Sequence, residues 1–590
     1  MSFTRRSKRL VALAVGLSLV AAACGDDDDA EPADTEAGGT TPPEETTPPE
    51  ETTPSEETTP SEETTPPDGT EAPAEGVAMT VTIPLNPDAV WDDGTPIGVA
   101  DFQCVLDATM NTPGSLSQVG YEKIVSIEEG ASPSEIVVSF SEVYAPYKNL
   151  FTNIIKADTV PDCFDVSAEW GDSLPFSGTQ WKLDSWSLDQ AVLVQNEAYW
   201  GPNTPTATEV VMVPKADADT EIASLKSGEV DFIFPQAYAG ITTALDDPNI
   251  SYTPGYGTNY EGLYFQQLNG PLANDTLRTA LSKSIDREAI LAGIYDPIFP
   301  GAPLLQCGLW VPTIGDWCDD TIFNDSYDPE GAVAMLEEAG WTKDGDGYWV
   351  DPETGEAPVL RWMINTPNPR RESTQALLIP LLQAAGFNVV ADNCDAACTF
   401  QQRLPALDYD IAMYINTASP DPTVTGIMSC DAVPTPENDN TGQNSTGWCN
   451  EEASALMTQS DQEVDLDARV DLIHQIGAFL AEDSVMLSLF QFPNIAAWRS
   501  DRLSGPVDKD AGNYFAWQNV WEWVPETGDQ ILVGAEQWPE CLNPITECAN
   551  SSWYVWTTAF KVLPTVWITT SEGTYEPTEL VSAEPTVEVL

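Results

Sequence analysis

Residues 90–102, which read VWDDGTPIGVADF, join a strand pattern to a helix pattern and constrain the fold more than any other part of the chain. Before them, residues 80–85 alternate polar and apolar side chains, as in a half-buried strand. Gly94 supplies a turn, because glycine adopts the positive φ that other residues resist. Apolar residues then recur at helical spacing, with Gly98 at the N-cap and Asp101 placed to meet free backbone N–H groups. The sequence therefore predicts a strand, a tight turn and a helix.

The first 24 residues have the pattern of an export signal. Four basic residues precede an apolar run, 10–23, that is too short to cross a bilayer. The run ends in three alanines and Cys24, which resembles a bacterial lipobox. We therefore expect a lipoprotein signal peptide over 1–23, lipidation of Cys24, and attachment to the extracytoplasmic face of the cell membrane. The alternative is a soluble secreted protein with an incidental cysteine.

Residues 24–77 are predicted to form a disordered acidic tether. They contain repeats of Pro, Glu and Thr between 40 and 67 and no Lys or Arg, and such a composition does not bury a core. The whole chain has a formal charge of −71. A charge of this sign excludes nucleic acid as a partner, because binding it requires the neutralisation of phosphates.

The sequence lacks the residues of most catalytic sites. Its one histidine, His474, lies on a stretch with a helical apolar stripe, which favours a structural role. With that role His474 does not assist a Ser or Cys nucleophile, a single histidine rules out multi-histidine zinc sites, and no phosphate-binding Gly-rich loop is present. Cys394 and Cys398 have no second matched couple that would complete a metal site. We expect no catalytic residue, no cofactor and no metal.

Ten of the eleven cysteines remain once Cys24 is set aside, and an even number in an exported protein predicts disulfides. The sequence leaves their connectivity open, but they fall into neighbouring couples along the chain. The predicted disulfides are Cys104/Cys163, Cys307/Cys318, Cys394/Cys398, Cys430/Cys449 and Cys541/Cys548.

The stretch 90–102 closely resembles the W-x-D-G-x-P-x-x-A-x-D-F/V signature of family 5 extracellular solute-binding proteins, the peptide-binding class that serves bacterial ABC importers. Segments 227–231, 277–287 and 338–341 resemble further motifs of the family in its order. This resemblance implies an α/β chain with the two-lobed type II periplasmic-binding-protein fold, mixed sheets and an extra subdomain. It also implies a protein without turnover, which captures a peptide or other small solute between its lobes and delivers it to ABC permease subunits.

The last 60 residues resemble the beginning of a family member rather than its end. Residues 531–544 are similar to the family's first strand and its Leu-Asn-Pro turn, and residues 553–563 to its first helix. We therefore predict a circular permutation; the alternative is a broken tandem gene. The predicted domains are 78–270 (part of lobe I, with the extra subdomain), 271–500 (lobe II), 501–530 (return to lobe I) and 531–590 (completion of lobe I).

Candidate ligand-binding residues come from three kinds of segment. The strand end 262–269 lies where the family chain crosses between lobes, and the loop 416–421 corresponds to a segment whose aspartate holds the peptide ammonium in peptide binders. Ala418 stands in place of that aspartate, which weakens the case for an ordinary peptide ligand. Aromatic residues after 513 either stack on a ligand or belong to the core. The candidates are Tyr264, Gln266, Asn269, Asn416, Ser419, Asp421, Tyr514, Trp517 and Asn543.

A second class of function stays open. Nineteen tryptophans and many carboxylates are compatible with a secreted carbohydrate-binding or glycan-hydrolysing protein, which would stack sugars on indole rings and use two carboxylates for hydrolysis. A binding protein that serves a sensor instead of an importer is a third interpretation. Assays of glycoside release against tight binding separate the first two.

Overall fold

The computed structural model describes residues 76–590 apart from 325, 439–441, 511–516, 537, 540, 547 and 549–551. All of the described residues belong to one compact unit. The predicted signal peptide, Cys24 and most of the predicted tether lie outside them. In the described part of the chain, no helix combines the length and the apolar composition that crossing a membrane requires.

The strand, turn and helix predicted near the start of the body are confirmed. Strand β1 (Met79–Pro84) alternates buried and half-buried residues, and helix α1 (Val99–Asn111) begins after its N-cap, Gly98. The carboxylate of Asp101 accepts hydrogen bonds from the Gly98 N–H (2.9 Å) and from the indole N–H of Trp91 (3.2 Å). The carboxylate thus ties the start of the helix to the turn that precedes it.

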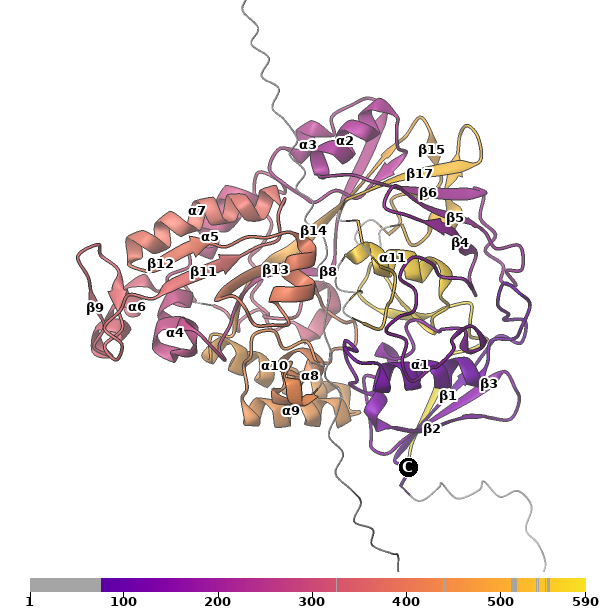
Figure 1. The fold of residues 1–590 in the computed structure, drawn as a ribbon, viewed down its shortest axis with the longest axis horizontal. Helices are drawn as coiled ribbons and strands as arrows, with labels where there is room; N and C mark the ends of the chain where they lie inside the picture. Colours follow the sequence, from indigo (N-terminus) through magenta and orange to yellow (C-terminus); the bar gives the residue numbers. More distant parts are fainter. Residues whose placement is uncertain are drawn as a thin grey trace, which may run out of the picture. The chain divides into compact units, whose positions relative to one another are not determined.

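One mixed sheet runs through the unit in the order β12-β11-β13-β8-β14-β7-β17-β6-β5-β4 (Figure 1). β17 is parallel to both of its neighbours, β11 is parallel to β12 and β13, and the other pairs are antiparallel. The strands are β4 (Trp181–Trp186), β5 (Ala191–Gln195), β6 (Glu209–Pro214), β7 (Phe232–Ile233), β8 (Ile250–Phe265), β11 (Val359–Met363), β12 (Asn388–Ala391), β13 (Ile411–Thr417), β14 (Met486–Arg499) and β17 (Gln530–Ala535).

The two longest strands of this sheet, β8 and β14, pair along most of their length near its middle. Their register shifts between Ser488 and Phe490 and again between Gln491 and Pro493. The second shift lies at a proline, which has no N–H to donate to the ladder. The centre of the sheet is therefore long but irregular.

Two buried apolar clusters divide the unit. The central core draws its residues from Ile222 to Ala497, and the terminal core draws its residues from 79–232 and 496–581. Strands β7 and β14 contribute to both cores, because successive side chains of a strand point to opposite faces of the sheet. Residues 222–270, predicted as part of lobe I, thus bury side chains in the same core as 271–497.

Helices pack on both cores. Helices α4, α6, α7, α9 and α10 bury side chains in the central core, whereas α1 and α11 bury theirs in the terminal core. The helices after α1 are α2 (Ala218–Ser227), α3 (Ile241–Ala244), α4 (Asp275–Lys283), α5 (Arg287–Ile290), α6 (Pro329–Glu338), α7 (Pro369–Ala385), α8 (Thr425–Met428), α9 (Glu451–Gln462), α10 (Leu466–Glu482) and α11 (Trp553–Val562). Short two-stranded sheets are β9 (Thr342–Lys343) with β10 (Trp349–Val350), β15 (Leu503–Ser504) with β16 (Val524–Pro525), and β18 (Trp567–Thr569) with β19 (Tyr575–Pro577).

A four-stranded sheet brings the two ends of the described chain together. Its order is β2-β3-β1-β20, with β2 (Ile124–Glu129), β3 (Glu135–Phe140) and β20 (Thr586–Val589). Met79 lies opposite Val589 in the β1–β20 pair, and the Leu590 N–H donates to the Ala78 carbonyl (2.9 Å). The C-terminal segment also supplies β17 to the large sheet and α11 to the terminal core, so it lies among N-terminal elements (Figure 1).

The five predicted disulfides are confirmed. In each pair the Cα atoms lie 4.4 to 5.9 Å apart, within the usual range for a disulfide. The bonded pairs are Cys104–Cys163, Cys307–Cys318, Cys394–Cys398, Cys430–Cys449 and Cys541–Cys548.

Candidate ligand-binding site

The loop after β13 lies at a contact between the two cores. The Ser419 Oγ lies 2.7 Å from the Asn149 Oδ1, and the Asn149 side-chain N–H donates to the Asp421 carbonyl (2.9 Å). The Tyr575 hydroxyl donates to the same Asn149 Oδ1 (2.6 Å). Tyr575 packs against the terminal core, whereas Ala418 is buried in the central core. Two of the ligand candidates are thus found where the cores meet.

The polar candidates of this loop bond to the protein itself. Asp421 forms an ion pair with Arg469, whose guanidinium lies 5.2 Å from the ring centroid of Trp317. Burial raises the pKa of Asp421, and Arg469 opposes that effect. Asn416 is half-buried, and its Oδ1 accepts from the Thr417 N–H (2.9 Å). A ligand role for Asn416, Ser419 and Asp421 stays a prediction.

The candidates at the end of β8 hold that strand in place. Tyr264 is fully buried and stacks on Tyr414, with 4.1 Å between ring centroids. The Gln266 amide is used at both ends, because its Nε2 donates to the Leu407 carbonyl (3.0 Å) and its Oε1 accepts from the Asn269 N–H (2.8 Å). Asn269 is exposed. The three residues lie together, but only Asn269 offers an exposed side chain to a ligand.

Of the three remaining candidates, Trp517 belongs to the terminal core and Asn543 follows Leu542 of that core. Trp517 is fully buried. The Asn543 side chain is 3% exposed and donates to the Val166 carbonyl (2.7 Å), which fixes the loop before β4. Tyr514 lies outside the described residues. Neither Trp517 nor Asn543 lies at the contact made by the 416–421 loop, and their ligand roles stay predictions.

A buried ionic cluster, which the sequence analysis missed, joins β8 to the start of α7. The Glu261 Oε2 accepts from the Arg370 Nη2 (2.7 Å), and its Oε1 accepts from the Arg371 Nε (2.6 Å). The side chains of Glu261, Arg370 and Arg371 are 0%, 0% and 4% exposed. Burial alone would raise the pKa of Glu261, but the two guanidiniums hold it below its usual value. The two adjacent arginines at the helix start were the available sequence signal.

Two buried carboxyl groups lie close to this cluster. Glu221 on α2 accepts a hydrogen bond from the Glu536 backbone N–H (3.2 Å), and Glu536 follows β17. Burial raises the pKa of Glu536 to about 7, opposed by the charge of Arg370, and raises the pKa of Glu221 well above its usual value. Near neutral pH at least one of the two carboxyl groups is protonated, because two buried neighbouring acids do not both ionise readily.

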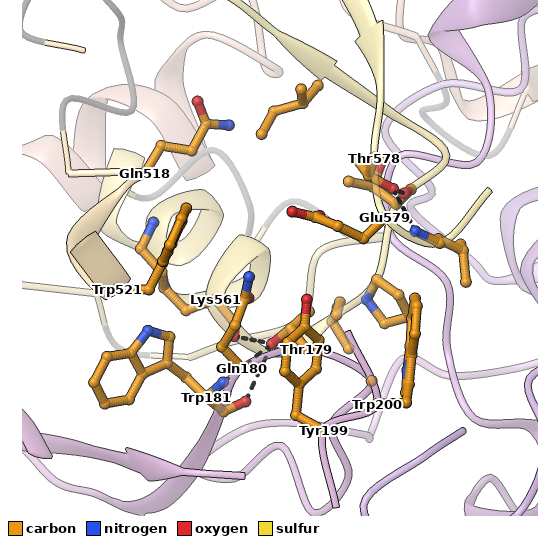
Figure 2. Close-up of a pocket in the computed structure, with 16 residues that line it drawn as sticks. Thr179, Gln180, Trp181, Tyr199, Trp200, Gln518, Trp521, Lys561, Thr578 and Glu579 are labelled. Atoms are coloured by element: carbon orange, nitrogen blue, oxygen red, sulfur yellow. Dashed lines mark hydrogen bonds between the residues drawn. The ribbon is translucent and has the colours of Figure 1, made fainter. Parts of the chain in front are cut away.

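A cavity of about 130 Å³ lies beside α11 in the terminal-core region (Figure 2). The start of β4 and the last turn of α11 meet there, because the Thr179 Oγ1 donates to the Lys561 carbonyl. Burial lowers the pKa of the Lys561 amine to about 7. The side chains that line the cavity and are labelled in Figure 2 are Thr179, Gln180, Trp181, Tyr199, Trp200, Gln518, Trp521, Lys561, Thr578 and Glu579.

These arrangements favour binding over catalysis. No nucleophile is held against a base in the sites described above, and the polar groups mostly hold the backbone in place. Among the described residues, no group of three or more His, Cys, Asp or Glu side chains is placed to hold a metal ion. What the fold offers is a contact between two cores, with polar side chains at that contact.

Comparison with known proteins shows where this fold occurs. Residues 75–432 match the family described as bacterial extracellular solute-binding proteins, family 5 Middle. A probable monoacyl phosphatidylinositol tetramannoside-binding protein of Mycobacterium tuberculosis is 27% identical over 179 residues, 28% of each chain. The glutathione-binding protein of Escherichia coli is 24% identical over 270 residues, 45% of this chain and 50% of that protein. The chain thus spans half or less of the length of these relatives.

Solved structures agree on the fold. The oligopeptide-binding protein AppA of Bacillus subtilis, in complex with a nonapeptide, superposes with a TM-score of 0.65 at 20% identity, covering 77% of this chain and 88% of that one. This likeness confirms the predicted type II periplasmic-binding-protein fold. Because the matched residues make up more than half of the sequence, the chain belongs to family 5 of the bacterial extracellular solute-binding proteins, which bind peptides and other solutes for ABC importers.

Proposed function

We propose that the protein is the lipid-anchored solute-binding component of an ABC importer. It captures a peptide or another small solute between its two lobes, releases it unaltered to permease subunits in the membrane, and has no turnover of its own. The family and the fold support the binding role. The lipobox-like sequence before Cys24 supports the anchor.

The observation that carries the proposal is the contact of Ser419 and Asp421 with Asn149 and Tyr575. Ala418, next to Ser419, is buried in the central core, whereas Tyr575 packs against the terminal core. A solute that separates or bridges this contact would change how the cores meet, which is how hinged binding proteins respond to ligands. The polar groups of the loop would then exchange their partners for those of the solute.

The identity of the solute is the first thing to measure. Mass spectrometry of compounds released from purified protein by denaturation identifies a candidate, and titration gives its affinity. With that compound bound, small-angle scattering is expected to show a smaller radius of gyration. Catalytic consumption of the compound, or binding without compaction, would contradict the proposal.

The anchor and the delivery step need separate tests. Replacing Cys24 with alanine is expected to move the protein from the membrane fraction to the soluble exported fraction, without a change in solute affinity. Uptake of the identified solute should be lost on deletion of the gene. Uptake that persists would favour a sensor partner over an importer.

We further propose that the order of the chain is a circular permutation in which 531–590 completes lobe I. The support is that β17 lies between β7 and β6, and that β20 pairs with β1. If 531–590 were instead the start of a second copy whose remainder is lost, nothing would require these residues to take up positions in the sheets of the first copy.

A further inference from the structure

The cavity beside α11 is bounded by one part of the fold. Its lining residues fall within 178–200 and 518–580, and none comes from the long intervening segment that builds the central core. Figure 2 shows Gln518, Trp521 and Lys561 on one side, and Trp200, Thr578 and Glu579 on the other. A molecule in this cavity would therefore occupy a different place from a solute held at the 416–421 contact.

Three of the lining side chains carry buried hydrogen-bond donors that have no partner among the described residues. They are the Lys561 Nζ, the Trp181 Nε1 and the Trp200 Nε1. Lys561 is 3% exposed, and its Nζ lies 5.0 Å from the ring centroid of Trp517. Buried donors are rarely left unpaired, because their lost hydration is not replaced. The cavity thus has a surplus of donors.

The polar groups around these donors are mostly engaged elsewhere. The Thr179 hydroxyl donates to the Lys561 carbonyl, and the Glu579 carboxylate accepts from the Asn203 side chain. Tyr199 is the other titratable group on the lining, and burial raises the pKa of its hydroxyl, so it stays neutral. Among the described residues, the amine and the two indole N–H groups are thus left without a hydrogen bond.

The charge of Lys561 responds to whatever lies beside it. Burial lowers the pKa of its amine to about 7, and the charge of Asp510 acts in the opposite direction. The amine is thus about half protonated near neutral pH. An anion that reached it would favour the protonated form, and its binding would take up a proton.

We propose that this cavity binds a small carboxylate, with the Lys561 amine as its charged donor. A carboxylate accepts several hydrogen bonds, and those from an ammonium group are strong because both partners are charged. The aromatic walls suit a short apolar body. A cavity of about 130 Å³ has room for an anion as small as acetate or propionate.

Sodium propionate is the probe that tests the proposal. Thermal unfolding of the full chain is followed against propionate concentration, with sodium chloride at matched ionic strength and inorganic phosphate as the second anion. We expect a saturable rise in the unfolding temperature with propionate but not with chloride. Lys561→Met should remove the rise, whereas Lys226→Met, which removes an exposed lysine on α2, should leave it unchanged.

Two further measurements separate a binding role from a structural one. Calorimetry at pH 8 in two buffers of different ionisation enthalpy should show uptake of close to one proton per propionate in the wild type. Trp200→Phe keeps the aromatic body and removes a donor on the opposite side of the cavity from Lys561, so it should leave proton uptake intact. Because Lys561→Met removes a buried amine and keeps an apolar chain of similar length, the variant is expected to fold.

The possible results decide the question. If propionate raised the unfolding temperature equally in the wild type and in Lys561→Met, the proposal would be overturned. A rise in the unfolding temperature with phosphate but not with propionate would also overturn it. Propionate binding without proton uptake would also overturn it, because the amine would then not be the anion's partner. A crystal grown with 3-bromopropionate should show the anomalous bromine signal inside the cavity, and a signal only elsewhere would contradict the assignment.

Discussion

Neutralising Glu261 is expected to destabilise the fold strongly. This carboxylate sits between Arg370 and Arg371 and is fully buried. Arg370 also donates to the Ala237 carbonyl (2.9 Å), and Arg371 donates to Asn365, so both guanidiniums are held in place when the carboxylate is changed. Glu261→Gln keeps the size of the side chain, removes its charge, and leaves two buried cations without a counter-charge.

The expected cost of Glu261→Gln is about 3–5 kcal/mol in the free energy of unfolding, the range measured when one partner of a buried ion pair is removed. Equilibrium unfolding in urea measures it. The matched control is Glu584→Gln, because Glu584 pairs with Lys148 at the surface with its side chain 57% exposed. Exposed ion pairs contribute up to about 1 kcal/mol to stability, so the free energy of unfolding of Glu584→Gln should differ little from that of the wild type.

The contribution of Glu261 to the free energy of unfolding depends on pH in a definite direction. Because the pKa of Glu261 is held below its usual value, its contribution is present at pH values above the unfolded-state pKa and is lost as pH falls through the folded-state pKa. The stability difference between the wild type and Glu261→Gln should therefore shrink on acidification. A loss below 1 kcal/mol for Glu261→Gln, or a loss equal to that of Glu584→Gln, would refute the reasoning.

Three other changes test the rest of the fold. Deleting 531–590 removes β17 from the middle of the large sheet and α11 from the terminal core, so circular dichroism should show loss of cooperative unfolding; unchanged stability and solute binding would remove the permutation. Replacing Cys430 and Cys449 with serine opens a loop with a sequence separation of 19 and should cost about 3 kcal/mol on chain-entropy grounds, as read from urea midpoints against the oxidised wild type. Burial lowers the folded-state pKa of Lys561 to about 7, so between about pH 7 and 10 the unfolded chain binds more protons than the folded chain. The stability of the wild type relative to Lys561→Met should therefore rise over that interval. A difference in unfolding temperature between the two proteins that is constant with pH would contradict this.

Local patterns in the sequence were enough to predict the elements that depend on near neighbours. The β1–α1 motif follows from alternation, a glycine turn and a capping carboxylate, all within a few residues. The disulfides follow from neighbouring couples, because four of the five close loops of 19 residues or fewer. Such features need no knowledge of long-range packing.

Side-chain roles that depend on distant partners were not predictable. Glu261 meets arginines more than a hundred positions away, and nothing local marks it as buried. Gln266 and Asn543 were proposed as ligand contacts because they are polar residues in family motifs. Both donate to backbone carbonyls, and their ligand roles stay predictions. A buried polar side chain needs hydrogen-bond partners whether or not a ligand is present, so residue type alone does not separate the two roles.

The proposed permutation would cost little free energy, because the chain ends of the described part lie side by side in the terminal-core region. Val589 lies opposite Met79, at a place where a short hairpin turn would join the two strands in the unpermuted order. In this chain the corresponding connection runs from β16, which ends at Pro525, to β17, which begins at Gln530. Both connections are short, and the entropy of closing a loop changes slowly with its length. On the proposed permutation, exchanging one connection for the other keeps the β1–β20 and β17–β6 pairings, so packing rather than chain order would determine this lobe.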